Sequence, residues 1–181
     1  MNTTTEEITQ DREALLLAIS IERHNSRRFR EWAMRFLPYD STVSIFLEEL
    51  AQEELDHEQE LLDTYHKYYG EKAPDNIPLP DELIHFARGL EAVKEHFFVI
   101  NSYIAQSLLE MAIKFERYSQ QFYLDLLDKT ADPVLSATYR MLSEYETEHE
   151  NILLERLEAE KINSIEQMVA ENHTLNGMQL I

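Results

Sequence analysis

Four segments of the chain repeat apolar residues every three or four positions, the period of a helix with one buried face. The pattern predicts main helices at roughly 8–36, 42–68, 98–128 and 133–161, with shorter helices at 81–96 and 164–172. Turn and breaker residues separate these segments at "LPYDS", "GEKAPDNIPLP" and "KTADP", and more weakly at "INS" near residue 163. We therefore expect an all-α fold.

Composition agrees with this interpretation. Only three glycines and five prolines occur in 181 residues, while helix-forming residues such as Glu, Leu and Ala are abundant. The length suits one domain, with a bundle at about 8–161, a long crossover at 69–97, and a C-terminal short helix and tail at 162–181.

Each apolar stripe is interrupted by acid at one point, and two of the stripes also carry a histidine. The stripes are Leu15, Ile19, Glu22, Ser26 and Phe29; Leu47, Leu50, Glu54, His57, Leu61 and Tyr65; Leu109, Ala112, Glu116, Gln120 and Tyr123; and Leu135, Leu142, Glu146, His149, Leu153 and Leu157. Residues three apart share a helix face, so each Glu-x-x-His pair can reach a common point. We expect all six interrupting side chains to face the core.

An internal repeat relates these interruptions. "AISIER" at 18–23 matches "AIKFER" at 112–117, and "LAQEELDHEQELL" at 50–62 matches "LSEYETEHENILL" at 142–154, with offsets of 94 and 92 residues. Each half of the chain is therefore predicted to be a helical hairpin. Two facing hairpins would close a four-helix bundle around four glutamates and two histidines.

Four buried carboxylates need a compensating charge, because an unpaired charge in an apolar interior is very costly. Two divalent cations would balance them, with neutral imidazoles completing the ligand set. Oxygen and nitrogen donors suit iron or manganese, and the chain has no cysteine to supply thiolates. Iron is the first expectation. The alternative is a metal-free structural bundle whose core glutamates are protonated and hydrogen-bonded.

Charge and hydropathy exclude several classes of partner. The formal net charge is -19 and the pI is about 4.6, which argues against nucleic acid and against anionic membrane surfaces. No run approaches 18 apolar residues, and the N-terminus lacks the pattern of a signal peptide. We expect a cytoplasmic protein.

The chain resembles the ferritin-like superfamily, in particular its rubrerythrin and bacterioferritin branch. The resemblance rests on Glu22, "ELDH" at 54–57, Glu116 and "ETEH" at 146–149, and covers about residues 10–160. It implies two metal ions held by one glutamate from each of two helices and Glu-x-x-His from each of the other two. Within that family the implied roles are as follows: Glu54 and Glu146 bridge the metals, Glu22 and Glu116 each cap one, and His57 and His149 each bind one.

The resemblance also implies a di-iron oxidoreductase that reacts with dioxygen or hydrogen peroxide. The alternatives are a ferroxidase or iron-storage protein, and an oxygenase acting on an organic substrate such as a long-chain aldehyde. Rubrerythrins often have a second glutamate where Ser119 stands, and they carry a cysteine-rich electron-transfer module, so any electron donor must be external. Leu55 replaces the haem-ligating methionine of bacterioferritin, so no haem is expected. A homodimer or higher homo-oligomer is expected.

Several other polar residues are assigned less specific roles. Tyr123 shares the stripe of Glu116 and is the candidate for contact with the metal centre, although such tyrosines are more often core residues. His24 is assigned to the surface, and acidic residues such as Glu53 and Glu58 to a solvated helix face. The remaining histidines have no inward-facing glutamate at ligand spacing.

Overall fold

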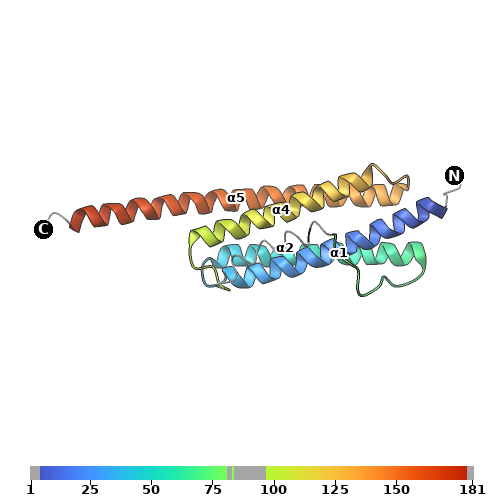
Figure 1. Cartoon of the computed structure of the whole chain (residues 1–181), viewed down its shortest axis with the longest axis horizontal. Helices are drawn as coiled ribbons and strands as arrows, with labels where there is room; N and C mark the ends of the chain where they lie inside the picture. Colours follow the sequence, from blue (N-terminus) through green and yellow to red (C-terminus); the bar gives the residue numbers. More distant parts are fainter. Residues whose placement is uncertain (1–4, 81–82, 84–96, 179–181) are drawn as a thin grey trace.

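The computed structural model describes residues 5–80, 83 and 97–178. Its long helices are α1 (Thr5–Phe36), α2 (Ser41–Tyr69), α4 (Ser102–Leu127) and α5 (Pro133–Met178). Helix α1 packs along α2 and α4 packs along α5, and the two hairpins lie against each other in one bundle (Figure 1). Within the described ranges no strand occurs, which confirms the all-α prediction.

The helix ends follow local sequence signals. The side chain of Asp40 accepts hydrogen bonds from the backbone of Thr42 and Val43 and so caps the start of α2. Gly70, with a φ of 69°, ends α2 in the left-handed conformation that glycine adopts without steric cost. Asn101 caps α4 in the same way as Asp40 caps α2. These ends lie close to the predicted ones, apart from the start of α4, which falls four residues later than expected.

Helix α5 does not break where the sequence predicted. Residues 162–164 were expected to separate a short helix at 164–172 from the bundle, but α5 continues through them to Met178. Asn163 and Ser164 each disfavour a helix by only a few tenths of a kcal/mol, and neither proline nor glycine interrupts the segment. The C-terminal part of α5 therefore runs well past the bundle (Figure 1). The predicted crossover helix at 81–96 lies outside the described residues, apart from the buried Leu83.

Two apolar clusters fill the bundle on either side of the predicted ligands. One contains Phe29, Trp32, Leu47, Leu108 and Phe115 among others, and the other contains Leu15, Leu61, Tyr65, Tyr123 and Tyr139 among others. Along α2, α4 and α5 the predicted ligand positions fall between these two sets, and on α1 Glu22 directly follows Ile21 of the first cluster. The polar centre is thus enclosed by apolar side chains at both ends.

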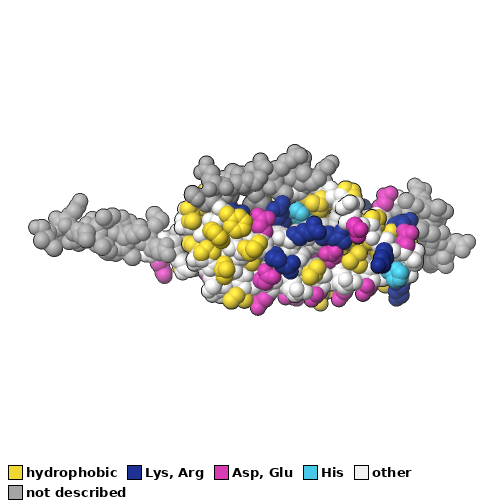
Figure 2. Space-filling model, turned by 90° about the horizontal axis from the view of Figure 1, so that it is seen from below, with side chains coloured by type: hydrophobic (Ala, Val, Ile, Leu, Met, Phe, Trp, Pro, Cys, Tyr) yellow, Lys and Arg dark blue, Asp and Glu magenta, His cyan; other side chains and the backbone are white. Residues whose placement is uncertain are grey.

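Charged side chains spread over the outside of the bundle. Figure 2 shows Lys and Arg gathered in the middle of one face, with acidic side chains around them and apolar side chains at the end from which α5 projects. Arg30 of α1 pairs with Glu48 of α2 at 3.1 Å. Among the described residues, no helix combines the length and the apolar character that crossing a membrane requires.

Candidate metal centre

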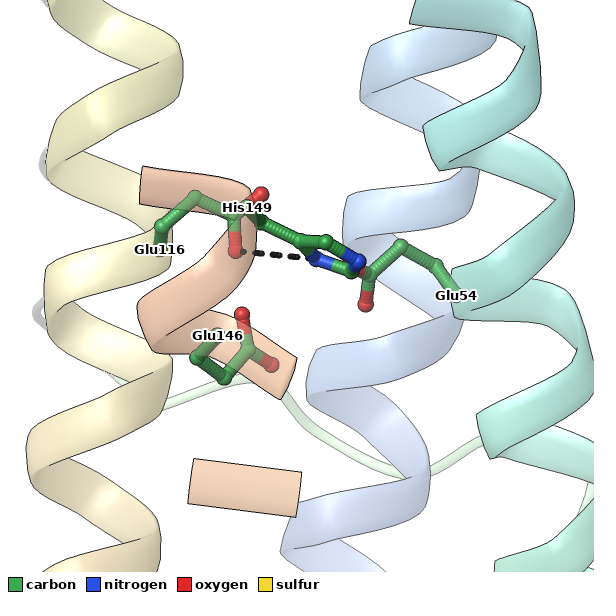
Figure 3. Close-up of side chains that lie close together, drawn as sticks. All are labelled: Glu54, Glu116, Glu146 and His149. Atoms are coloured by element: carbon green, nitrogen blue, oxygen red, sulfur yellow. Dashed lines mark ion pairs between the residues drawn. The ribbon is translucent and has the colours of Figure 1, made fainter. Parts of the chain in front are cut away.

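Six side chains from all four helices meet at the middle of the bundle. Glu22, Glu54, Glu116 and Glu146 are fully buried, and His57 and His149 are 7% and 2% exposed. Figure 3 shows Glu54, Glu116, Glu146 and His149 turned toward one another from α2, α4 and α5. The structure therefore brings together every ligand that the sequence predicted.

These side chains form two overlapping groups of ligand atoms. Glu54, Glu116, Glu146 and His149 each offer one atom within 4.8 Å of the others. Glu22, Glu54 and His57 form a second group by the same measure. Glu54 belongs to both groups, which is the place of a carboxylate shared between two cations.

Both histidines turn the same ring nitrogen toward the carboxylates. Nδ1 of His149 lies 3.1 Å from Oε1 of Glu54 and 3.6 Å from Oε2 of Glu116. Nδ1 of His57 lies 3.7 Å from Oε2 of Glu22. The two rings lie with their centroids 6.1 Å apart and their planes at 22°. Nδ1 is therefore the ring atom that faces the buried glutamates at both positions.

The ligand atoms are short of hydrogen-bond partners within the protein. Each of the six side chains has at least one buried oxygen or nitrogen that makes no hydrogen bond, and Glu54, Glu116 and Glu146 have two each. Buried polar atoms in folded proteins are nearly always satisfied, so such a cluster calls for a bound partner. A set of carboxylate oxygens and imidazole nitrogens fits divalent iron or manganese.

The protons of the metal-free centre are distributed unevenly. Burial, together with the charge of neighbouring glutamates, raises the pKa of Glu54 and of Glu146 well above the ordinary value. Burial also opposes ionisation of Glu22, but hydrogen bonding and the nearby His57 outweigh it and lower the pKa of that carboxyl. For His149 burial disfavours the imidazolium, yet the adjacent Glu116 and Glu54 raise its pKa to about 12.

Tyr123 touches the centre through Glu22. Its hydroxyl donates a hydrogen bond to Oε1 of Glu22, and its side chain is completely buried. Burial and the charge of Glu22 raise the pKa of Tyr123 well above that of a free phenol, so the tyrosine stays protonated and remains a donor. The ring of Tyr139 stacks on the ring of Tyr123, with their centroids 6.3 Å apart.

The repeat is visible in the contacts around the ligands as well. Arg23 pairs with Glu58 at 2.7 Å in the first hairpin, and Arg117 pairs with Glu150 at 2.6 Å in the second. These residues are equivalent by the offsets of 94 and 92 found in the sequence. Glu58 is 8% exposed, so its assignment to a solvated face was wrong. The repeat offered a signal for this ion pair, because Arg23 and Arg117 stand at equivalent positions, as do Glu58 and Glu150.

Two residues beside the histidines were missed as contacts of the centre. Nε2 of His149 lies 2.8 Å from Oε2 of Glu53, which had been assigned to the solvated helix face. Tyr145 stacks on the ring of His57 with a centroid distance of 4.9 Å. Glu53 and Tyr145 precede the two Glu-x-x-His pairs at equivalent positions of the repeat. The only sign in the sequence that these two positions make different contacts was their difference in residue type.

Two further assignments need correction. The sequence placed Gln120 on the buried face of its helix, but Ser119 occupies that place and is fully buried, because the 3.6-residue helical period leaves both positions near the edge of the stripe. His24 was assigned to the surface, but it packs against Phe115 with ring centroids 5.5 Å apart. Burial, and then the neighbouring Arg28 and Arg27, lower the pKa of His24 to about 4.

His24 lies outside the centre. With Arg23, Arg27 and residues 75–79 it lines a cleft of about 390 Å³ on the outer side of α1. None of the six predicted ligands lines that cleft. His66 is exposed at the end of α2, and His85, His96 and the side chain of His173 lie outside the described residues.

Comparison with known proteins supports the fold. No family model matches the chain, and no curated protein matches it. The solved structure of Hypothetical Protein Pfu-1136390-001 from Pyrococcus furiosus is similar, with a TM-score of 0.65, 21% sequence identity, and coverage of 82% of this chain and 89% of that one. At that identity the likeness concerns the fold alone.

Proposed function

We propose that the chain is a ferritin-like di-iron carboxylate oxidoreductase, similar to rubrerythrin, that reacts with dioxygen or hydrogen peroxide. One observation carries the proposal: two overlapping groups of buried glutamate and histidine side chains share Glu54 and leave their ligand atoms without hydrogen-bond partners. The sequence resemblance assigns the same six residues to two metal ions. The absence of cysteine supports iron or manganese over a thiolate-bound metal.

Glu22, Glu54 and His57 would hold one ion, and Glu54, Glu116, Glu146 and His149 the other. Two ferrous ions held close together supply two electrons to a bound oxidant, which is the redox chemistry expected of the loaded centre. The raised pKa values of Glu54, Glu146 and His149 mean that these groups bind protons more strongly in the metal-free protein than free side chains do. Those protons leave when cations bind.

The residues around the ligands keep the centre dry and fixed. Apolar clusters close the bundle at both ends of the site and exclude bulk water. Tyr123 holds the carboxylate of Glu22 in place by donating a hydrogen bond to it. The cleft at His24 touches none of the ligands, so an organic molecule bound there would have no direct contact with the metals.

A metal-free structural bundle is a poorer account of the same residues. Each buried polar atom without a partner costs roughly 1–3 kcal/mol, and the centre has several such atoms. Retaining six polar groups in an otherwise apolar core therefore requires a compensating interaction. Cation binding supplies that interaction for all six together.

Anaerobic loading with ferrous iron tests the proposal. We expect two iron ions per chain after removal of excess iron, and a rise in near-ultraviolet absorption when dioxygen or hydrogen peroxide is added. A variant in which Glu54 is replaced by alanine should lose both, because that residue is shared by the two groups of ligand atoms. Many irons per chain in a large hollow assembly would instead identify a storage protein. Absence of bound iron would contradict the proposal.

A further inference from the structure

The two histidines of the centre differ in what contacts the ring edge that faces away from the ligands. On α2, Glu53 precedes the first Glu-x-x-His pair, and its carboxylate reaches across to Nε2 of His149 at 2.8 Å. On α5, the residue at the equivalent position of the repeat is Tyr145. Its ring stacks on His57 at 4.9 Å with an interplanar angle of 28° and offers that imidazole a face, not an acceptor.

A carboxylate at Nε2 changes how an imidazole binds a metal. It accepts a hydrogen bond from Nε2–H, which fixes the tautomer whose lone pair is on Nδ1, and it makes that lone pair more basic. Nδ1 is the atom that His149 turns toward Glu54 and Glu116. Glu53 therefore prepares His149 for coordination, whereas the stacked ring of Tyr145 leaves the tautomer of His57 unassisted.

The carboxylates reinforce this difference. The group around His149 contains Glu54, Glu116 and Glu146, whereas the group around His57 contains only Glu54 and Glu22. Glu22 also shares one oxygen with the hydroxyl of Tyr123. Fewer ligand atoms and a less basic imidazole both lower the affinity for a cation at the His57 position.

We propose that the two metal positions are inequivalent: the position at His149 binds its ion first and more tightly, and Glu53 is the positioning residue that makes it so. The inference rests on the proposed dimetal function. Loss of a partner of this kind typically weakens metal binding by about 10-fold to 100-fold. Glu53 is 55% exposed, and water competes for its carboxylate, so we expect an effect near the lower end of that range.

Anaerobic titration of the metal-free protein with cobalt(II), followed by calorimetry and by the visible spectrum, tests the inference without measuring activity. The wild-type protein should bind two ions in separate steps whose affinities differ by about tenfold or more. Glu53→Gln should weaken the first step by about tenfold and leave the second nearly unchanged. Glu60→Gln is the matched control, since it removes the same charge from an exposed position of the same helix and should change neither step.

Three results separate the inference from the function on which it rests. Two ions bound with equal affinity by the wild-type protein would overturn the inequivalence and leave the dimetal centre standing. Equal weakening by Glu53→Gln and Glu60→Gln would show that Glu53 acts only through its charge, and would overturn its positioning role. Failure of the wild-type protein to bind cobalt(II), manganese(II) or iron(II) would contradict the dimetal function itself. Far-ultraviolet circular dichroism establishes that each variant is folded.

Discussion

Asn25 donates a hydrogen bond from Nδ2 to Oγ of Ser119 at 3.0 Å, in the fully buried interior of the bundle. Each of these residues stands three positions after a predicted ligand, Glu22 in the first hairpin and Glu116 in the second. Equivalent positions of the repeat therefore meet where α1 passes α4. The contact sets the register of one hairpin against the other directly beside the centre.

Ser119→Ala should destabilise the fold by roughly 1–3 kcal/mol, because it leaves the buried amide of Asn25 without its acceptor. Urea denaturation of the metal-free protein measures the change. Ser107→Ala is the control, since that hydroxyl bonds only to the backbone of its own helix, at Tyr103. An equal effect of both substitutions would show that the contact between the hairpins contributes nothing.

Tyr123→Phe should lower the free energy of unfolding by roughly 1.5–3 kcal/mol, the range for a hydrogen bond to a charged group. The substitution removes only the hydroxyl that donates to Glu22. Tyr139→Phe provides a closely matched control, because the hydroxyl of Tyr139 is buried and makes no hydrogen bond. That second substitution should be neutral or slightly stabilising. Thermal or urea unfolding of the two variants in chelator makes the comparison.

Glu146→Gln should have opposite effects with and without metal. In the metal-free protein burial and the charge of Glu54 raise the pKa of Glu146, so ionisation of this carboxyl opposes folding. Glutamine avoids that cost, and the variant should be as stable as the wild type or more stable in chelator. With manganese(II) at about 100 times its dissociation constant, the wild type should gain about 2.7 kcal/mol and the variant much less. A variant stabilised by metal as strongly as the wild type would contradict the role of Glu146 as a ligand.

Asp132→Ala should cost roughly 0.5–2 kcal/mol at neutral pH by removing the cap of α5. Its carboxylate accepts hydrogen bonds from the backbone of Val134 and Leu135 and from the hydroxyl of Tyr68. Burial raises the pKa of Asp132, but these hydrogen bonds outweigh it and lower the pKa below 3.8. A carboxyl whose pKa is lowered by folding stabilises the fold at pH values above its unfolded pKa. This contribution disappears as the pH falls through the pKa of the folded state. The difference between wild type and variant in urea denaturation should therefore shrink below pH 3.8. Asp132→Asn, which retains capping ability, should lose less stability at neutral pH.

Ending the chain after Lys161 should change the free energy of unfolding by less than about 1 kcal/mol, because side chains that remain in water contribute little burial energy. Ile162, Ile165 and Val169 of α5 are 50–62% exposed. Circular dichroism during thermal unfolding at two protein concentrations measures the effect. A large loss of stability that depends on concentration would show that this segment packs against a second copy of the chain.

The sequence was sufficient to predict the four long helices and the burial of the six candidate ligands, because both leave periodic signals. Glu54 and His57 interrupt an apolar stripe at helical spacing, and the repeat supplies an independent second instance of the same pattern. Charge in an apolar stripe is rare enough to single out these positions. All six predicted ligands are therefore buried at one point of the bundle.

Contacts between helices were harder to predict, because they depend on rotation and register that no single stripe records. Glu53 lies on the polar side of α2, and only the arrangement of α2 and α5 brings its carboxylate to His149. His24 was assigned to the surface because it lies outside the stripe, yet the neighbouring helix α4 covers it with Phe115. The continuation of α5 past residue 161 leaves no clear signal, because Asn163 and Ser164 are weak helix formers that are compatible with both a helix end and a helix interior.

The arrangement of the two hairpins has a consequence for how such a centre can vary. Each hairpin contributes one isolated glutamate and one Glu-x-x-His pair. Two identical hairpins related by a two-fold axis would therefore supply the same set of four glutamates and two histidines. In a symmetric pair of that kind, any substitution next to one imidazole would also appear next to the other. Joining both copies in one polypeptide removes that constraint. Positions 53 and 145 can then carry a carboxylate on one side and an aromatic ring on the other, as they do in this chain.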